Sequence, residues 1–395
     1  MGFLAGRVTF TRCRVMGRAP RLFGPEQLDQ LAAYAIGRQR AVSADGVEVG
    51  WGAGGHVLDT RFELAKNIIN DTLHFALRVD VQKIPADLKR AYYQLELDAL
   101  AADNPSGRPS ARQRQEARDA ARDRLDAEAR DGRFVRRKTY PLLWDAQTQE
   151  LLVGTTAQGA LERLHALFEK TFGCGLEVLS AGRSAFLLAE ARTQGRGVDD
   201  ARPGAFIPAL SPRDAVAWQP DEARRDFLGN EFLLWLWYVL DTETDTIPLS
   251  DQSAVTVMLA RTLVLECPRG QTGRETITSD GPAQLPEARR AIEAGKLPRK
   301  AGLILVRHDK QYELTLHAEL LAVTGAKLPP PEEEDPRARL EERIRQVRHL
   351  VETLDLLYDA FLRRRIGSAW ARELPLMQAW LQPAARPAAP RAATG

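Results

Sequence analysis

Cysteine is scarce in this sequence and follows no disulfide or metal-binding pattern. The 395 residues include three cysteines, Cys13, Cys174 and Cys267, which lie far apart and form no C-x-x-C pair. An odd, sparse set of this kind does not supply a disulfide framework or a zinc knuckle. The sequence therefore predicts a protein of a reducing compartment, and we expect it in the cytoplasm.

The sequence also lacks an apolar run long enough to cross a membrane. Its longest run, residues 232–240, has about half the length of a membrane span. Residues 1–11 contain too short an apolar stretch for a signal peptide. We expect no membrane among the partners of this protein.

Signatures of catalysis and of cofactor binding are missing as well. The six histidines show no metal-ligand spacing such as H-E-x-x-H. There is no G-x-x-x-x-G-K-[ST] motif for ATP and no G-x-S-x-G nucleophile motif. The glycine-rich residues 50–55 lack the lysine and the strand–helix context of a phosphate loop, and we expect a turn there. The sequence predicts no enzyme, no cofactor and no metal.

Charge of one sign is not in large excess. Lysine and arginine number 55 against 53 aspartates and glutamates, which gives a formal net charge of +2. This balance excludes a uniformly basic nucleic-acid coat, but it allows a basic groove or hole beside an acidic exterior. Hydrophobic residues make up 44%, which is enough for a sizeable core.

Periodicity predicts an α+β fold, in which antiparallel sheets built from hairpins carry helices, with a C-terminal helical, coiled-coil-like extension. Strands are expected at residues 7–16, 72–83, 140–144, 150–155, 176–179, 255–266, 275–279, 303–308 and 311–316. Helices are expected at residues 25–36, from Pro85 onward, at 111–130, after a cap at Thr155 or Thr156, at 229–238 as a buried helix, and at 284–294, ending at Gly295. The regions are an N-terminal α+β part (1–180), a second α+β part with an inserted apolar helix (181–328), a heptad extension (329–382) and a disordered tail (383–395).

For two helical segments, the sequence does not decide what they pack against. Residues 111–130 are rich in arginine and have Leu125 as their one large apolar residue, so this helix either stands in solvent or faces something charged. The C-terminal segment has a heptad seam, which either forms a self-associating coiled coil or packs on its own domain. The seam consists of Leu340, Ile344, Val347, Val351, Leu354, Tyr358 and Phe361.

A short basic stretch ahead of the first expected hairpin is a candidate binding site. Its members are Arg133, Phe134, Arg136, Arg137 and Lys138, and they lead directly into Tyr140. Cations of this kind neutralise phosphates, and a neighbouring ring can pack against a sugar or a base. The alternative is a solvated helix–strand junction without a ligand.

A second basic cluster surrounds Gly295, ahead of the other expected hairpin. It comprises Arg289, Arg290, Lys296, Arg299 and Lys300. Cations near a helix C-terminus are favourable for reasons of the helix dipole alone, which is the structural alternative. Because both clusters precede a β-hairpin, they could line one surface.

Several motifs in their order resemble the recombination-associated protein RdgC family. One stretch runs from Lys83-Ile84-Pro85 through the basic junction, Leu142-Leu143-Trp144-Asp145 and the strand at residues 151–154 to Phe172-Gly173. The other comprises residues 291–296 (AIEAGK), Lys300 and the hairpin at 303–316. The likeness covers roughly residues 6–326. Residues 229–245 look like an insertion, and the segment after Pro329 has no counterpart.

The resemblance implies a ring-shaped homodimer, associated with the nucleoid, whose positively charged hole encircles duplex DNA without sequence preference. It also implies that the protein limits access of the RecA recombinase to DNA. By position, the family's basic junction falls on Arg133, Phe134, Arg136, Arg137 and Lys138, and its helix end on Lys296. A protein-interaction scaffold that has lost DNA binding is the alternative. A nuclease would need a metal-carboxylate signature, which the sequence does not display.

Overall fold

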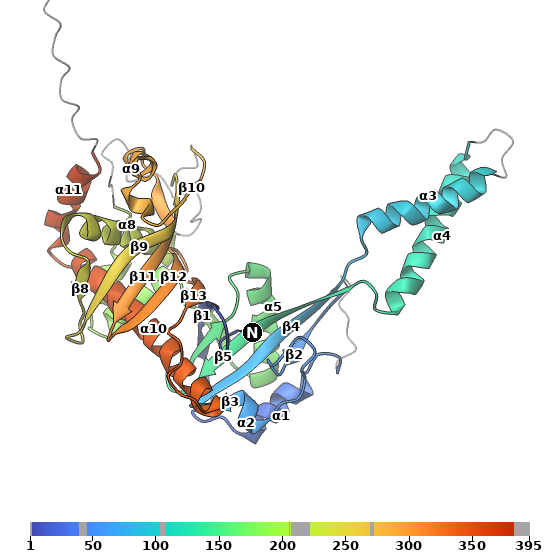
Figure 1. Ribbon diagram of the computed structural model, residues 1–395, viewed down its shortest axis with the longest axis horizontal. Helices are drawn as coiled ribbons and strands as arrows, with labels where there is room; N and C mark the ends of the chain where they lie inside the picture. Colours follow the sequence, from blue (N-terminus) through green and yellow to red (C-terminus); the bar gives the residue numbers. More distant parts are fainter. Residues whose placement is uncertain are drawn as a thin grey trace, which may run out of the picture.

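The computed structural model describes residues 2–38, 46–102, 108–204, 206, 222–268 and 272–382, which form the expected α+β fold (Figure 1). The tail predicted to be disordered, residues 383–395, lies outside the described residues. The strands are β1 (Val8–Met16), β2 (Val47–Gly52), β3 (Ile68–Ile69), β4 (Thr72–Gln82), β5 (Val135–Asp145), β6 (Glu150–Val153), β7 (Gly175–Val178), β8 (Thr246–Pro248), β9 (Ala254–Glu266), β10 (Glu275–Ser279), β11 (Leu297–Arg307), β12 (Lys310–His317) and β13 (Val323–Lys327). The helices are α1 (Pro25–Ala33), α2 (Leu64–Asn67), α3 (Ala86–Ala102), α4 (Ala111–Arg130), α5 (Gln158–Phe172), α6 (Ala181–Glu190), α7 (Gly195–Asp199), α8 (Phe227–Thr242), α9 (Pro286–Glu293), α10 (Pro336–Arg365) and α11 (Trp370–Trp380).

Strand β1 joins two half-sheets into one continuous path. Neighbouring strands follow the order β10-β9-β11-β12-β13-β1-β6-β5-β4-β2 and pair antiparallel. The first part of β1 pairs with β13, through Val8 and Phe10, whereas Thr11 and the residues after it pair with β6 and β7. A strand near the start of the chain therefore connects the N-terminal hairpins to the C-terminal ones.

An aromatic core fills the N-terminal half between its sheet and α5. Trp144 lies 5.0 Å from Phe168, and Trp51 lies 5.2 Å from Phe75, measured between ring centroids. The Trp51 indole N–H donates to the Thr171 hydroxyl over 2.8 Å, so its one polar atom is satisfied inside the core. Packing of this kind fixes α5 on one face of the sheet.

Differences from the predicted elements are local. Gly50 and Gly52 belong to strand β2 rather than to a turn. A Cβ atom at Gly50 would lie 2.6 Å from the Ile36 backbone, so glycine lets the segment after α1 cross the strand closely. Neither expected threonine is the N-cap of α5, which is Ala157. The second hairpin turns at His308 and Asp309, one residue early, since both residues adopt positive φ.

Helices α3 and α4 form an arm that projects away from the sheet (Figure 1). The bounds predicted for the polar helix at residues 111–130 are confirmed by α4, whose N-cap Ser110 accepts from the Gln113 N–H. This helix buries a narrow stripe, Ala117, Ala121, Leu125 and Ala129, and packs on α3. Within the described chain, α3 itself buries none of its residues.

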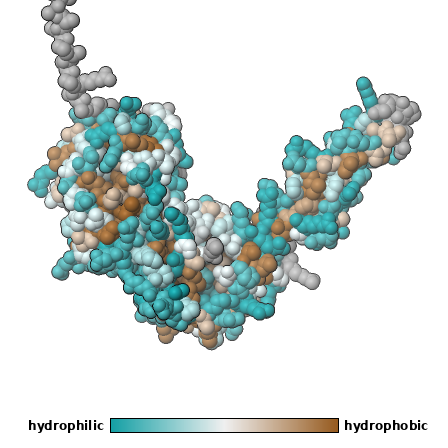
Figure 2. Space-filling model, in the orientation of Figure 1, coloured by the Kyte–Doolittle hydropathy of each residue, from teal (hydrophilic) through white to brown (hydrophobic). Residues whose placement is uncertain are grey.

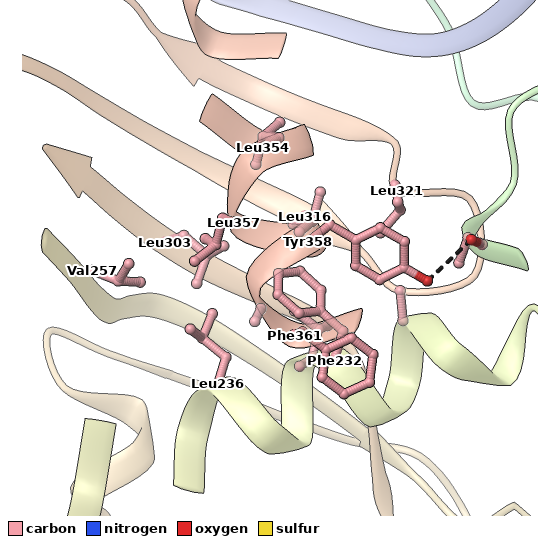
Figure 3. Close-up of a cluster of buried hydrophobic side chains, with 14 of the residues drawn as sticks. Phe232, Leu236, Val257, Leu303, Leu316, Leu321, Leu354, Leu357, Tyr358 and Phe361 are labelled. Atoms are coloured by element: carbon pink, nitrogen blue, oxygen red, sulfur yellow. Dashed lines mark hydrogen bonds between the residues drawn. The ribbon is translucent and has the colours of Figure 1, made fainter. Parts of the chain in front are cut away.

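Helix α8 is the buried apolar helix that the sequence predicted. It packs beneath α10 and β11, where Phe232 lies 5.1 Å from Tyr358 and 5.7 Å from Phe361 between ring centroids (Figure 3). The Tyr358 hydroxyl donates to the Ala181 carbonyl over 3.0 Å. Helix α8 therefore supplies a large part of the C-terminal core.

The position of helix α10 decides whether the heptad seam self-associates or packs on its own domain. The seam residues Ile344, Val347, Leu354, Tyr358 and Phe361 are buried in the same core as α8. A self-associating coiled coil through this seam is therefore wrong, because these side chains are already covered by their own chain.

Polar contacts from α10 also reach the N-terminal half of the sheet. Arg348 Nε lies 2.6 Å from Asp145 Oδ2, and Arg343 Nε donates to the Phe3 carbonyl over 2.6 Å. On the other side, Arg307 of β11 binds Glu352 of α10 over 2.9 Å. The helix thus fastens the two half-sheets to each other.

Arg12 of β1 is the most enclosed of these links. Its guanidinium is buried and lies 2.9 Å from Glu150 of β6 and 2.8 Å from Asp355 of α10. Burial alone lowers the pKa of Arg12, but the two carboxylates outweigh it and raise the pKa above its ordinary value. The charge is therefore held inside the protein by its partners.

We expect Arg12→Met to lower the free energy of unfolding by about 3 kcal/mol, because it leaves two carboxylates without their shared cation. Urea denaturation followed by circular dichroism measures this change. Arg14→Met, at an exposed position of the same strand, is the matched control and should change stability by less than about 0.5 kcal/mol. Equal effects of the two substitutions would contradict a structural role for the Arg12 pairs.

Candidate nucleic-acid interface

The predicted basic stretch lies mostly within strand β5, not ahead of it. β5 begins at Val135, five residues earlier than expected, because β4 is long enough to pair with it throughout. Arg136 lies opposite Val81, and Lys138 lies opposite Val79. Arg133 and Phe134 occupy the turn that leads from α4 into the strand.

Strand geometry divides these cations between the two faces of the sheet. Successive side chains of a strand point to opposite faces, so Arg136 and Lys138 share one face and Arg137 lies on the other. Arg137 Nε is 3.6 Å from Asp80 Oδ2, and the same carboxylate binds Arg78 over 2.6 Å. Arg137 is itself exposed, but it is paired with the carboxylate of the buried Asp80, so its charge is partly compensated within the protein.

Arg136 and Lys138 are exposed and form no ion pair with any described residue. Arg133 reaches Glu128 over 3.9 Å at an exposed position, a contact that contributes little. Phe134 is half-buried, and its carbonyl accepts from the Lys83 N–H over 3.0 Å, which fixes the backbone of the junction. Two available cations thus stand on a well-anchored strand at the base of the arm.

The same part of β5 is a sheet edge. In the described part of the chain, residues 135–140 pair with β4 alone, because β6 pairs with residues 142–145. Charged side chains on an exposed edge strand discourage unwanted pairing with other chains. That protective role is the structural alternative to phosphate binding.

Most of the second cluster is engaged inside the protein. Lys296 is buried and forms an ion pair with Glu275. Arg299 lies 3.0 Å from Glu266 and 2.6 Å from Glu319. Arg289 donates to the Trp380 carbonyl, and its guanidinium lies 4.7 Å from the centre of the Trp380 ring. These three side chains hold α9 and β11 in place.

Arg290 and Lys300 are the members of this cluster without an ion pair to a described residue. Lys300 lies opposite His317 on β12. Burial, together with Lys300 and Arg299, lowers the pKa of His317 to about 4. The neighbouring imidazole is therefore neutral near pH 7 and adds no charge to this surface.

The two clusters do not form one patch within a single copy of the chain. α9 and β11 belong to the lobe that also holds α8 and α11, whereas the β5 strip lies where the sheet leads into the arm (Figure 1). Figure 2 shows the molecule hollowed between that lobe and the arm. A common surface would need a second copy or a ligand that spans the hollow.

The arm carries mixed charge. α4 exposes Arg112, Arg114, Arg118, Arg122, Arg124 and Arg130, interspersed with acidic residues. Arg112 pairs with Glu116 over 2.9 Å, and the Arg124 guanidinium lies 4.3 Å from the centre of the Tyr92 ring. The exposed arginines are thus partly neutralised within the arm itself.

The described residues hold no group of three or more His, Cys, Asp or Glu side chains that could bind a metal ion. Among the helices described, none is long and apolar enough to span a membrane. Cys13, Cys174 and Cys267 are buried.

A cavity of about 740 Å³ was not predicted from the sequence. Leu143 of β5, Leu152 of β6, Leu188 of α6 and Val351 of α10 contribute to its lining. No local sequence motif indicates this cavity, because its lining residues are far apart in the chain and meet only after folding.

We expect Lys296→Ala to lower the free energy of unfolding by about 2 kcal/mol, because it removes a buried stem and the partner of Glu275. Lys300→Ala, four residues away and half-buried, should change stability by less than about 0.5 kcal/mol. Thermal and urea unfolding measure both variants. If the two variants are equally stable, Lys296 is not the structural member of the cluster.

No family model matches the sequence, and no curated protein matches it. The resemblance to the RdgC family therefore remains a prediction from the motifs and their order.

Proposed function

We propose that this protein is a non-sequence-specific, RdgC-like binder of double-stranded DNA that acts as a ring-shaped homodimer. In this role it modulates recombination by limiting the access of RecA to DNA. The observation that carries the proposal is the pair Arg136 and Lys138, two exposed cations on one face of β5 without an ion pair to a described residue.

The spacing of this pair suits a phosphate backbone. Residues two apart in a strand lie about 7 Å apart, so two flexible cations can contact two phosphates of one DNA strand. Contacts to phosphate position a duplex without reading its bases, which agrees with binding that ignores sequence. Phe134 and Arg133 are next to the pair and extend the same surface toward the arm.

We retain only some of the predicted binding residues as DNA contacts. Those at the base of the arm are Arg133, Phe134, Arg136 and Lys138, and those in the other lobe are Arg290 and Lys300. We assign Arg137, Arg289, Lys296 and Arg299 to ion pairs that stabilise the fold, because each binds an acidic partner at 3.6 Å or less, whereas Arg133 reaches Glu128 only over 3.9 Å.

The arm supports the homodimer part of the proposal. α3 and α4 pack on each other through a thin stripe, and Leu95 on α3 is 57% exposed. A helix gains most of its stability from tertiary packing, and within the described chain α3 and α4 pack chiefly on each other. A second copy that covers the arm would supply this packing and would close the hollow seen in Figure 2.

A protein-interaction scaffold is the second candidate function. The net charge of +2 and the mixed charge of the arm favour it, since neither attracts a polyanion over long distances. A nuclease is less well supported, because the described residues contain no metal-binding cluster.

We expect the double substitution Arg136→Ala and Lys138→Ala to weaken duplex binding at least tenfold at moderate salt, because two phosphate contacts are lost. The slope of log affinity against log salt should fall by about 2. Fluorescence anisotropy with a labelled duplex at several salt concentrations measures both quantities. Arg137→Ala is the matched control on the opposite face, and it should leave the slope unchanged, whereas the loss of one phosphate contact would lower it by about 0.9.

The same titrations separate the rival functions. Binding of duplexes of unrelated sequence with equal affinity supports the proposal. Degradation of the DNA on addition of magnesium would support a nuclease. A wild-type protein that does not bind DNA would favour the scaffold. If the folded double variant binds as tightly as the wild type, Arg136 and Lys138 are not the contacts.

We expect Leu95→Glu to convert a dimer into a monomer, because it places a charge in the contact that covers the arm. Size-exclusion chromatography with light scattering measures the mass at several concentrations. Leu22→Glu replaces a leucine that is 75% exposed away from the arm, and it should leave the mass unchanged. A wild-type protein that is monomeric at all concentrations would contradict the homodimer.

A further inference from the structure

The cavity between α10 and the β5–β6 hairpin has the size and lining of a ligand site. Its volume is about 740 Å³, within the range of small-molecule pockets. Leu143, Leu152, Leu188, Val351 and Leu356 give it a largely apolar wall. One side of the cavity consists of α10.

The carboxylates around this cavity already have cationic partners. Asp145 binds Arg348 over 2.6 Å. Glu150 and Asp355 share the buried guanidinium of Arg12. An occupant therefore finds few free acceptors here, and a cationic ligand would have to compete with these pairs.

The end of the cavity near the C-terminus of α6 has an excess of positive charge. Arg192 and Arg363 both bind the single carboxylate of Asp359, the latter over 2.8 Å. The Arg192 NH2 group is buried and has no hydrogen-bond partner among the described residues. Burial, and then the nearby charge of Arg363, lower the pKa of Arg192. An anionic group that reached these two guanidinium groups from the cavity would balance the charge that the single carboxylate of Asp359 leaves uncompensated.

We propose that this cavity binds a small amphipathic carboxylate. Its apolar body lies against the leucine-rich wall, and its carboxylate accepts hydrogen bonds from Arg192 and Arg363. A carboxylate fits because guanidinium groups bind its two oxygens in a matching planar geometry. Because α10 and the β5–β6 hairpin both line the cavity, the ligand also strengthens the contact between the two half-sheets.

Isothermal titration calorimetry of the full chain with sodium decanoate tests the proposal. Wild-type protein should bind one decanoate per chain with a measurable heat, whereas decyltrimethylammonium, of equal tail length and opposite charge, should not bind at this site. Arg363→Gln and Arg192→Gln should each weaken decanoate binding about tenfold or more. Arg372→Gln, an exposed arginine of α11 that does not line the cavity, is the matched control and should bind as the wild type does.

A second variant tests the apolar wall without changing charge. Val351→Trp fills the cavity and should abolish decanoate binding, while circular dichroism and the melting temperature show that the chain is folded. The proposal fails if the wild type does not bind decanoate, or if binding survives in the folded Val351→Trp variant. It also fails if Arg363→Gln and Arg372→Gln bind equally well. Duplex DNA binding, measured in parallel, should not change in any of these variants, so failure here is separate from failure of the DNA-binding proposal.

Discussion

The shared pairing of strand β1 is the constraint on which the architecture depends. Its first residues complete the C-terminal half-sheet through β13, and its later residues complete the N-terminal half-sheet through β6 and β7. Backbone hydrogen bonding thus makes one sheet from segments more than 300 residues apart, as in the pair Val8 and Ala326. Arg12 adds an ionic link at the same place, because it binds both β6 and α10. A buried guanidinium is tolerated there because two carboxylates compensate for its lost hydration.

The sheet also determines which cations face outward. β4 and β5 are long strands that run together toward the arm, and the pleat of β5 divides neighbouring cations between its two faces. Asp80, on the neighbouring strand, forms ion pairs with both Arg78 and Arg137. Arg136 and Lys138 face the valines of β4, which offer no counter-charge. The proposed DNA contact is therefore a consequence of strand register, and the arm beyond it is the surface where we propose that a second copy binds.

The C-terminal segment packs into the core and is not a separate extension. Its heptad seam covers α8, and its polar side chains reach both half-sheets through Asp145, Phe3 and Arg307. Where α10 passes the β5–β6 hairpin, the surfaces do not close completely, and a leucine-lined cavity with an arginine-rich end remains. A segment that stabilises the fold in this way can also couple the fold to a ligand.

The sequence by itself determined the α+β class, the bounds of α4 and the burial of α8, since these depend on local periodicity and capping. It also located the cations, but it could not say which of them were available. Lys296 and Lys300 look alike in the chain, yet one is buried against Glu275 and the other has no ion pair with a described residue. The heptad seam was likewise compatible both with self-association and with packing on its own domain. The contact between the seam and α8 decides for packing within the chain. Only the tertiary structure decided these points, because the partner of a side chain is set by long-range pairing and register rather than by its neighbours in sequence.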